Sequence, residues 1–403
     1  MVPTPLVPSP FLSVARAFNA FGAELFARLR GDLPGKNFVF SPSNVATAMT
    51  LTLAGAGGRT AAQIATALRL DPEDDAIHDR VARLLRELGG PELRAATRMW
   101  GSLELDAEPE FLSIARNGYG APFDRIDVRR PKEVSAEMNA WVKEQTAGRI
   151  PDLVLPASIK PDTKLVIIAV LYFKASWREP FSRSQTGDAP FERRDGSRIE
   201  VPMMNLEAHL GHAVTASAEV VELQFCSPLH STTEGRQPVG AAPSEEGPRF
   251  SMLLALPKSR LEEVPFNEIA GVSTVAPGPR RALNPEVILT VPRFKMTSRF
   301  DLMLALAAMG MLDMGTAEAD FSRITDCETL SLDEVTHQAV IDVDEEGATA
   351  AAATFVSAAT LDFTTTPPPL IVRFDRPFVF LLRENRSGTV LFAGWVEDPS
   401  LLI

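Results

Sequence analysis

The sequence has little of what several protein classes require. Its 403 residues contain only two cysteines, Cys226 and Cys327, and five histidines. This excludes a disulfide-rich scaffold and leaves no Cys/His cluster at metal-ligand spacing, so we expect no metal and no cofactor. We expect both cysteines to act as small apolar residues. No run reaches the roughly 18 apolar residues that a membrane span needs, and residues 1–10 show neither the basic nor the apolar region of an export signal.

Positive charge is also scarce. The chain has 40 Lys and Arg against 52 Asp and Glu, which gives a formal net charge of −12 at pH 7. Such a surface repels phosphate backbones and anionic lipids, so we expect neither a nucleic acid nor a membrane as partner. The composition that is present, 45% hydrophobic and 23% charged, is typical of a globular chain with a sizeable core.

Helix patterns dominate the first part of the chain and strand patterns the later part. Apolar residues at three- and four-residue spacing predict helices over residues 11–30, 45–54, 60–70 and 134–146. Continuous or alternating apolar runs predict strands over residues 165–173, 220–225, 252–256, 287–291, 330–343, 378–382 and 390–392. This order, with some interleaving, predicts an α+β fold.

Two stretches differ from the rest of the chain. Residues 227–248 are polar and rich in Ser, Pro, Gly and Glu, so we expect an inserted surface loop there. Residues 345–369 open with two glutamates and a glycine, continue with an alanine-rich run and end in three prolines. Alone, the alanine-rich run is compatible with a helix, a flexible linker or a low-complexity filler. The strand predicted just upstream makes these interpretations less favoured.

Residues 340–354, with the sequence Val-Ile-Asp-Val-Asp-Glu-Glu-Gly-Ala-Thr-Ala-Ala-Ala-Ala-Thr, resemble the strand and hinge of the serpins, a family of serine protease inhibitors. Further matches follow the order of the family along almost the whole chain. They include Asn37, Ser41, Pro42, Thr60, Asn139, Trp141, Thr146, Gly148, Phe173, Trp177, Phe181, Pro292, Phe294, His337, Pro377, Phe378, Leu391 and Gly394. Each match is weak alone, but their shared order is strong evidence.

The resemblance implies one serpin domain over residues 1–403, with three β-sheets, about eight to nine helices and an exposed reactive-centre loop. It implies that the chain is not an enzyme but a monomeric inhibitor. A target serine protease cuts the loop and is held as a covalent acyl-enzyme complex while the loop inserts into the main sheet. The alternative within the family is a non-inhibitory carrier or chaperone.

The resemblance also carries expectations about cofactors and location. Some serpins are activated by heparin, but the charges of residues 71–98 nearly cancel, so we expect no heparin dependence. The family implies an extracellular or periplasmic location. Because no signal peptide is visible, a cytoplasmic location stays open.

Residues 345–369 are expected to form the hinge and the reactive-centre loop. A strand that enters a packed sheet buries alternate side chains, which must be small or uncharged. The hinge is expected over residues 345–354, from Glu345 to Thr354, and it begins with Glu345-Glu346-Gly347. After this glycine, one alternate set is Ala348, Ala350, Ala352, Thr354, Val356 and Ala358, and the other is Thr349, Ala351, Ala353, Phe355, Ser357 and Ala359. Neither set contains a charge or a proline, so residues 348–361 can all donate to a strand ladder.

The reactive bond is placed by the spacing that the family keeps from the first hinge glutamate. From Glu345 this spacing reaches Leu361, so the expected cut lies between Leu361 and Asp362. The segment that follows is longer than in typical members, which leaves cuts at Thr360 or Phe363 as alternatives. A leucine fits the apolar pockets of chymotrypsin-like, subtilisin-like or elastase-like proteases.

Four further residues, Ser41, Asn44, Trp177 and His337, are expected where the main sheet opens. A lone histidine on a strand is usually a satisfied core residue, but the resemblance places His337 in a polar network beneath the opening. The asparagine that the family usually has on the buried strand is Ala169 here, whereas Asn44 stands where a serine is usual. We therefore expect the Asn44 side chain to pair with His337.

Overall fold

The computed structural model describes residues 10–72, 74–226, 247–259, 264–272, 284–326, 330–332, 334–348 and 368–401. Nearly all of the predicted polar loop at 227–248 lies outside the described residues. So do Cys327 and residues 349–367, which include most of the hinge, the predicted cut between Leu361 and Asp362, and its alternatives Thr360 and Phe363.

Eight α-helices lie within the described residues, and six of them come early in the chain. They are α1 (Pro10–Asp32), α2 (Pro42–Gly55), α3 (Gly58–Ala67), α4 (Ile77–Leu88), α5 (Pro109–Tyr119), α6 (Pro131–Gln145), α7 (Phe266–Ala270) and α8 (Met303–Ala308). The four predicted helices correspond to α1, α2, α3 and α6. Helix α2 begins after Ser41, whose hydroxyl accepts the Asn44 backbone N–H at 3.2 Å, as an N-cap serine does.

The strands make four hydrogen-bonded sheets among the described residues. They are β1 (Phe38–Phe40), β2 (Leu93–Ser102), β3 (Phe123–Ile126), β4 (Leu165–Phe173), β5 (Ala175–Ser176), β6 (Gly187–Glu192), β7 (Arg198–His209), β8 (Gly211–Val214), β9 (Ala218–Gln224), β10 (Phe250–Pro257), β11 (Glu286–Pro292), β12 (Phe294–Asp301), β13 (Thr336–Val343), β14 (Gly347–Ala348), β15 (Leu370–Arg373), β16 (Phe378–Glu384) and β17 (Val390–Val396). Each predicted strand overlaps one of these.

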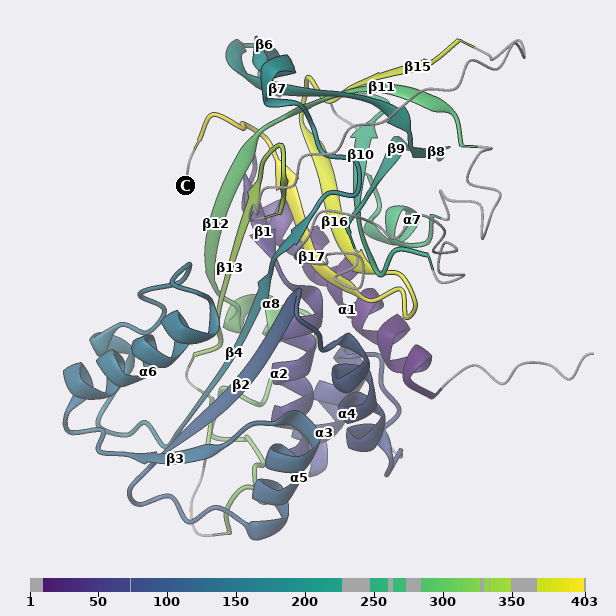
Figure 1. Cartoon of the computed structure of the whole chain (residues 1–403). Helices are drawn as coiled ribbons and strands as arrows, with labels where there is room; N and C mark the ends of the chain where they lie inside the picture. The colour runs from purple at the N-terminus through teal and green to yellow at the C-terminus, as the bar shows by residue number, and fades with distance from the viewer. Residues whose placement is uncertain are drawn as a thin grey trace, which may run out of the picture.

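Two of the sheets are complete units. The six-stranded sheet has the order β1-β17-β16-β10-β9-β8, and every residue of β10 and β17 is buried. The four-stranded sheet β15-β11-β7-β6 lies at the upper end of the molecule in Figure 1. The continuous apolar strands β10 and β17 are typical of a sheet covered on both faces, whereas β6, β7 and β15 expose many of their residues.

The other two sheets are halves of one layer. One has the order β12-β13-β14-β5 and the other β3-β2-β4. Figure 1 shows that β13 of the first half and β4 of the second run side by side where the two halves meet. The expected α+β fold is confirmed, and its main sheet is divided lengthwise where β4 meets β13.

Two apolar cores hold these layers. The larger one includes residues of β4 and β13, of the six-stranded sheet, of the β15-β11-β7-β6 sheet and of helices α1 to α5. The smaller one lies on the other face of β2 and β4 under α6, where Trp100 and Val170 pack against Met138 and Val142. Helix α6 is therefore attached to the β3-β2-β4 half of the divided sheet.

Two findings concern the surface. Cys226 is exposed and not in a disulfide, so its predicted role as an apolar filler is wrong. It follows the buried end of β9 and lies beyond the core. None of the helices that the structure describes has the length and apolar character needed to cross a membrane.

Candidate functional site: the gap in the divided sheet and its hinge

The site lies between the edges of β4 and β13, which face each other without a ladder of backbone hydrogen bonds. Strand β4 pairs with β2 along its other edge, and β13 pairs with β12 along its other edge. Among the described residues, no backbone hydrogen bond joins β4 to β13. Unpaired N–H and C=O groups along a strand edge form a template for a further strand.

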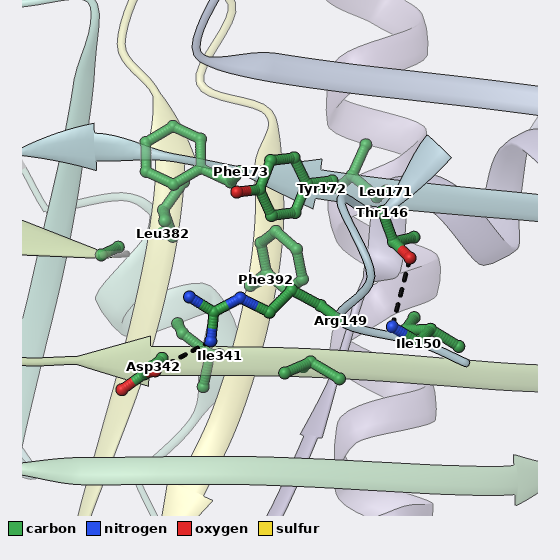
Figure 2. Close-up of a pocket in the computed structure, with 12 residues that line it drawn as sticks. Thr146, Arg149, Ile150, Leu171, Tyr172, Phe173, Ile341, Asp342, Leu382 and Phe392 are labelled. Carbon is green, nitrogen blue, oxygen red and sulfur yellow. Dashed lines mark hydrogen bonds and ion pairs between the residues drawn. The ribbon is translucent and has the colours of Figure 1, made fainter. Parts of the chain in front are cut away.

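A narrow cavity lies between the two edges, as Figure 2 shows. Its volume is about 20 Å³, which is room for little more than one water molecule. It is lined by Leu171, Tyr172 and Phe173 of β4, Val340, Ile341 and Asp342 of β13, Leu382 and Phe392 of the six-stranded sheet, Thr146, Arg149 and Ile150 after α6, and Ala348 of the hinge. A strand can therefore enter only if the two halves of the sheet separate.

The hinge already occupies one end of this gap. Ala348 lies opposite Val343 of β13 on one side and opposite Ala175 of β5 on the other. Strand β5 directly follows β4, so β14 lies between the two halves. A side chain at Gly347 would place its Cβ 2.2 Å from the carbonyl oxygen of Ala175, so this close backbone approach requires glycine.

Glu345 anchors the base of the hinge and is only 1% exposed. Its carboxylate accepts hydrogen bonds from the Arg293 guanidinium and from the Thr186 hydroxyl, the latter at 2.8 Å. Burial alone would raise the pKa of Glu345, but the hydrogen bonds from Arg293 and Thr186 outweigh burial and hold this pKa below its usual value. The residue is therefore a fixed, ionised anchor at neutral pH.

Trp177 holds the turn between β13 and β14. Its indole Nε1 donates to the carbonyl oxygen of Asp344 at 2.8 Å, and its backbone N–H donates to that of Glu346 at 2.8 Å. The Asp344 carboxylate accepts the backbone N–H groups of Glu346 and Gly347 at 2.9 and 3.1 Å. Trp177 also stacks on Phe225, with ring centroids 4.4 Å apart, which ties the turn to the six-stranded sheet.

His337 lies at the far end of β13 from the hinge. Its Nε2 accepts the backbone N–H of Ser41 at 2.9 Å, so the ring must carry its proton on Nδ1. Burial lowers the pKa of His337 to about 4, which keeps the ring neutral at pH 7. The structure thus brings Ser41, Asn44 and His337 together and places Trp177 at the opposite end of the gap.

The predicted pairing of the Asn44 side chain with His337 is wrong. No hydrogen bond joins the two side chains in the described part of the chain, and the ring Nε2 accepts the Ser41 backbone N–H instead. Asn44 instead stands in the first turn of α2, where its backbone N–H serves the helix cap. The cap geometry, which a residue count does not show, decides this contact.

Comparison with known proteins places this arrangement in a family. A family model described as Serpin (serine protease inhibitor) matches residues 16–399. The chain belongs to the serpin family. The bovine leukocyte elastase inhibitor is 30% identical over 399 residues, covering 96% of this chain and 99% of that serpin. A serpin-like protein of Thermococcus kodakarensis is 32% identical over 394 residues, covering 96% and 86%.

Solved serpin structures share the fold. Human thyroxine-binding globulin has a TM-score of 0.79 at 24% identity, covering 98% of this chain and all of that one. Serpin48 of the insect Tenebrio molitor has a TM-score of 0.77 at 25% identity, covering 96% and 98%. The match to the globulin shows the fold alone. Several of the similar proteins are named leukocyte elastase inhibitors, and the family as a whole is described as serine protease inhibitors.

Sequence reasoning missed the residues that hold the hinge and the gap. Thr186 and Arg293 fix Glu345, and Arg149 reaches Asp342. Arg293 stands between Pro292 and Phe294, and Arg149 follows Gly148, all of which match the family pattern. Their positions in the sequence therefore gave a signal that could have singled them out. Their partners lie far away along the chain, and no local spacing reveals them.

Proposed function

We propose that this serpin traps serine proteases of the chymotrypsin-like, subtilisin-like or elastase-like type. The protease cuts the loop near Leu361 and forms an ester with its own serine. The loop then enters the gap between β4 and β13 before water can release the protease. The observation that carries this proposal is the register of β14, which already pairs with β13 on one side and with β5, the direct continuation of β4, on the other.

The register on the β13 side can be continued through the loop. Because Val343 faces Ala348 in an antiparallel pair, Ala350 would face Ile341 and Ala352 would face Ala339 in the inserted strand. Ile341 and Ala339 point into the larger core. Directly opposed residues share a face, so Ala350 and Ala352 would also point inward.

The register on the other side gives the same answer independently. Ala348 faces Ala175, so Ala350 would face Phe173 and Ala352 would face Leu171. These two residues of β4 also belong to the larger core. Both edges therefore direct the same alternate set inward, and its members have the small or uncharged side chains that a packed core accepts.

The first experiment asks whether trapping occurs and where the loop is cut. The serpin is mixed with chymotrypsin and with subtilisin, and complexes that resist SDS are scored on gels. We expect such complexes, and a released C-terminal peptide that begins at Asp362. After cleavage, loop insertion should raise the melting temperature by about 10 °C or more. Cleavage without complexes and without this rise would favour the non-inhibitory carrier or chaperone.

A matched pair of variants tests the register. Ala352→Asp would bury a charge in the larger core, whereas Ala351→Asp would lie opposite Val340 and Tyr172, which are only half-buried. We expect Ala352→Asp to be cut as a substrate with little complex formed, because an unpaired buried charge costs several kcal/mol. Ala351→Asp should keep more of the inhibition. If Ala351→Asp were the more damaging variant, the proposed register would be wrong.

A further inference from the structure

The turn after α6 carries an arginine to the opposite half of the divided sheet. Ala147 and Gly148 have φ angles of 49° and 78°, a left-handed conformation that ends the helix. The Thr146 hydroxyl accepts the Ile150 backbone N–H at 3.2 Å and closes the turn. The turn is thereby fixed, and Arg149 leaves it in a defined direction.

Arg149 forms an ion pair with a residue of β13. Its guanidinium Nη1 lies 3.1 Å from Oδ2 of Asp342, and the two side chains are 35% and 28% exposed. Figure 2 shows the Arg149 side chain extended from the turn toward Asp342, beside Phe392 and Tyr172. Both members of the pair line the cavity that the loop must enter.

The pair connects two bodies that must move apart. Helix α6 packs on Trp100, Ile168 and Val170 of the β3-β2-β4 half, whereas Asp342 belongs to β13 in the other half. In the continued register, Asp342 also faces Thr349, the first loop residue after β14. The contact therefore spans the gap at the point where insertion would begin.

We propose that the Arg149–Asp342 ion pair is a clasp that slows separation of the sheet halves. Arg149 acts only through its contact with Asp342 and is therefore a positioning residue. This inference rests on the proposed function. If the clasp is weakened, the loop inserts faster and fewer proteases escape before they are trapped. The intact serpin would also convert more readily without a protease. An ion pair at this exposure supports a change of about two- to fivefold in the insertion rate.

The test uses Arg149→Gln, Asp342→Asn and the double variant. The control is Arg129→Gln, because Arg129 pairs with Asp127 before α6 and on the same half of the sheet. The first measurement needs no protease: a synthetic peptide with the sequence of residues 348–361 is added to the intact serpin. Its insertion rate is followed by native gels and by the gain in melting temperature. The second measurement is the number of serpin molecules consumed per protease trapped.

We expect each single variant to insert the peptide about two- to fivefold faster than the wild type, and the double variant to be no faster than either. Salt should speed insertion into the wild type and have less effect on the variants, because it screens the pair. If the effects of the two substitutions were additive, or if Arg129→Gln had an equal effect, the clasp would be refuted while the proposed function would stand. If the peptide inserted into no variant and not into the wild type, the proposed function would fail with it.

Discussion

The replacement His337→Gln should make the stability of this serpin less sensitive to acid. The ring is 5% exposed, and its Nε2 accepts a hydrogen bond from Ser41. A protonated ring has no free acceptor, so protonation breaks this bond and places a charge in the core. Burial accordingly lowers the pKa of His337 to about 4.

The direction and size of the effect follow from proton linkage. Between about pH 4 and pH 6.5 the unfolded chain binds a proton at this histidine and the folded chain does not, so stability falls as the pH is lowered through this range. A folded pKa of about 4 implies a loss of about 2 kcal/mol in unfolding free energy between pH 7 and pH 5. Carboxylates with lowered pKa values, such as Glu345, change the stability mainly below about pH 5, outside the interval between pH 7 and pH 5.

The assay is urea unfolding at pH 7 and at pH 5, followed by tryptophan fluorescence. The difference in unfolding free energy between the two pH values should shrink by about 2 kcal/mol in His337→Gln. Burial also lowers the pKa of His78 to about 4, so part of the acid sensitivity should remain. His209→Gln is the control, because that ring is exposed. An unchanged pH dependence in His337→Gln would refute the buried, neutral state of the ring.

Two further predictions concern the hinge and the segment after α6. Gly347→Ala should expel β14 from the gap, because the new Cβ would meet the Ala175 carbonyl oxygen at 2.2 Å. It should raise the number of serpin molecules consumed per protease, whereas Gly187→Ala, with nothing within 4 Å, should not. Asn139→Ala should lower the unfolding free energy by about 2–3 kcal/mol, because the Asn139 amide makes three hydrogen bonds to the backbone of residues 153–154. Urea unfolding would measure this loss, and Asn117→Ala, which removes only an exposed bond to a nearby side chain, should cost less than 1 kcal/mol.

The elements that sequence reasoning found are those whose burial leaves a simple pattern. Strand β4 has the predicted bounds, 165–173, because a strand covered on both faces is a continuous apolar run. Strand β2 was missed, because exposed Arg94 and half-buried Arg98 interrupt its apolar residues. The charges around α4 were interpreted as a solvated face, and the helix there does expose Arg83 and Arg86.

The site was predictable to the extent that it depends on side-chain size along one strand. The need for small or uncharged residues at alternate positions follows from the geometry of a single inserted strand, whereas the need for glycine at 347 follows from the close approach of the Ala175 carbonyl oxygen. The partners of Glu345 were not predictable in this way, because Thr186 and Arg293 come from other parts of the chain. The hydrogen bond to His337 depends on how Ser41 begins α2, which is set by the tertiary structure.

The contacts at the two ends of the gap imply an order of events. The hinge end is already a strand in register with β13 and with β5, which directly follows β4, so ladder formation can continue from Ala348 without a new nucleus. The continued register places Thr354 opposite His337, so the contact between His337 and Ser41 is reached only after the intervening alanines have paired. The Arg149–Asp342 pair therefore opposes the first step of insertion, whereas the buried histidine lies where a late step would take place. Acid should thus weaken the far end of the gap and leave the start of insertion under the control of the clasp.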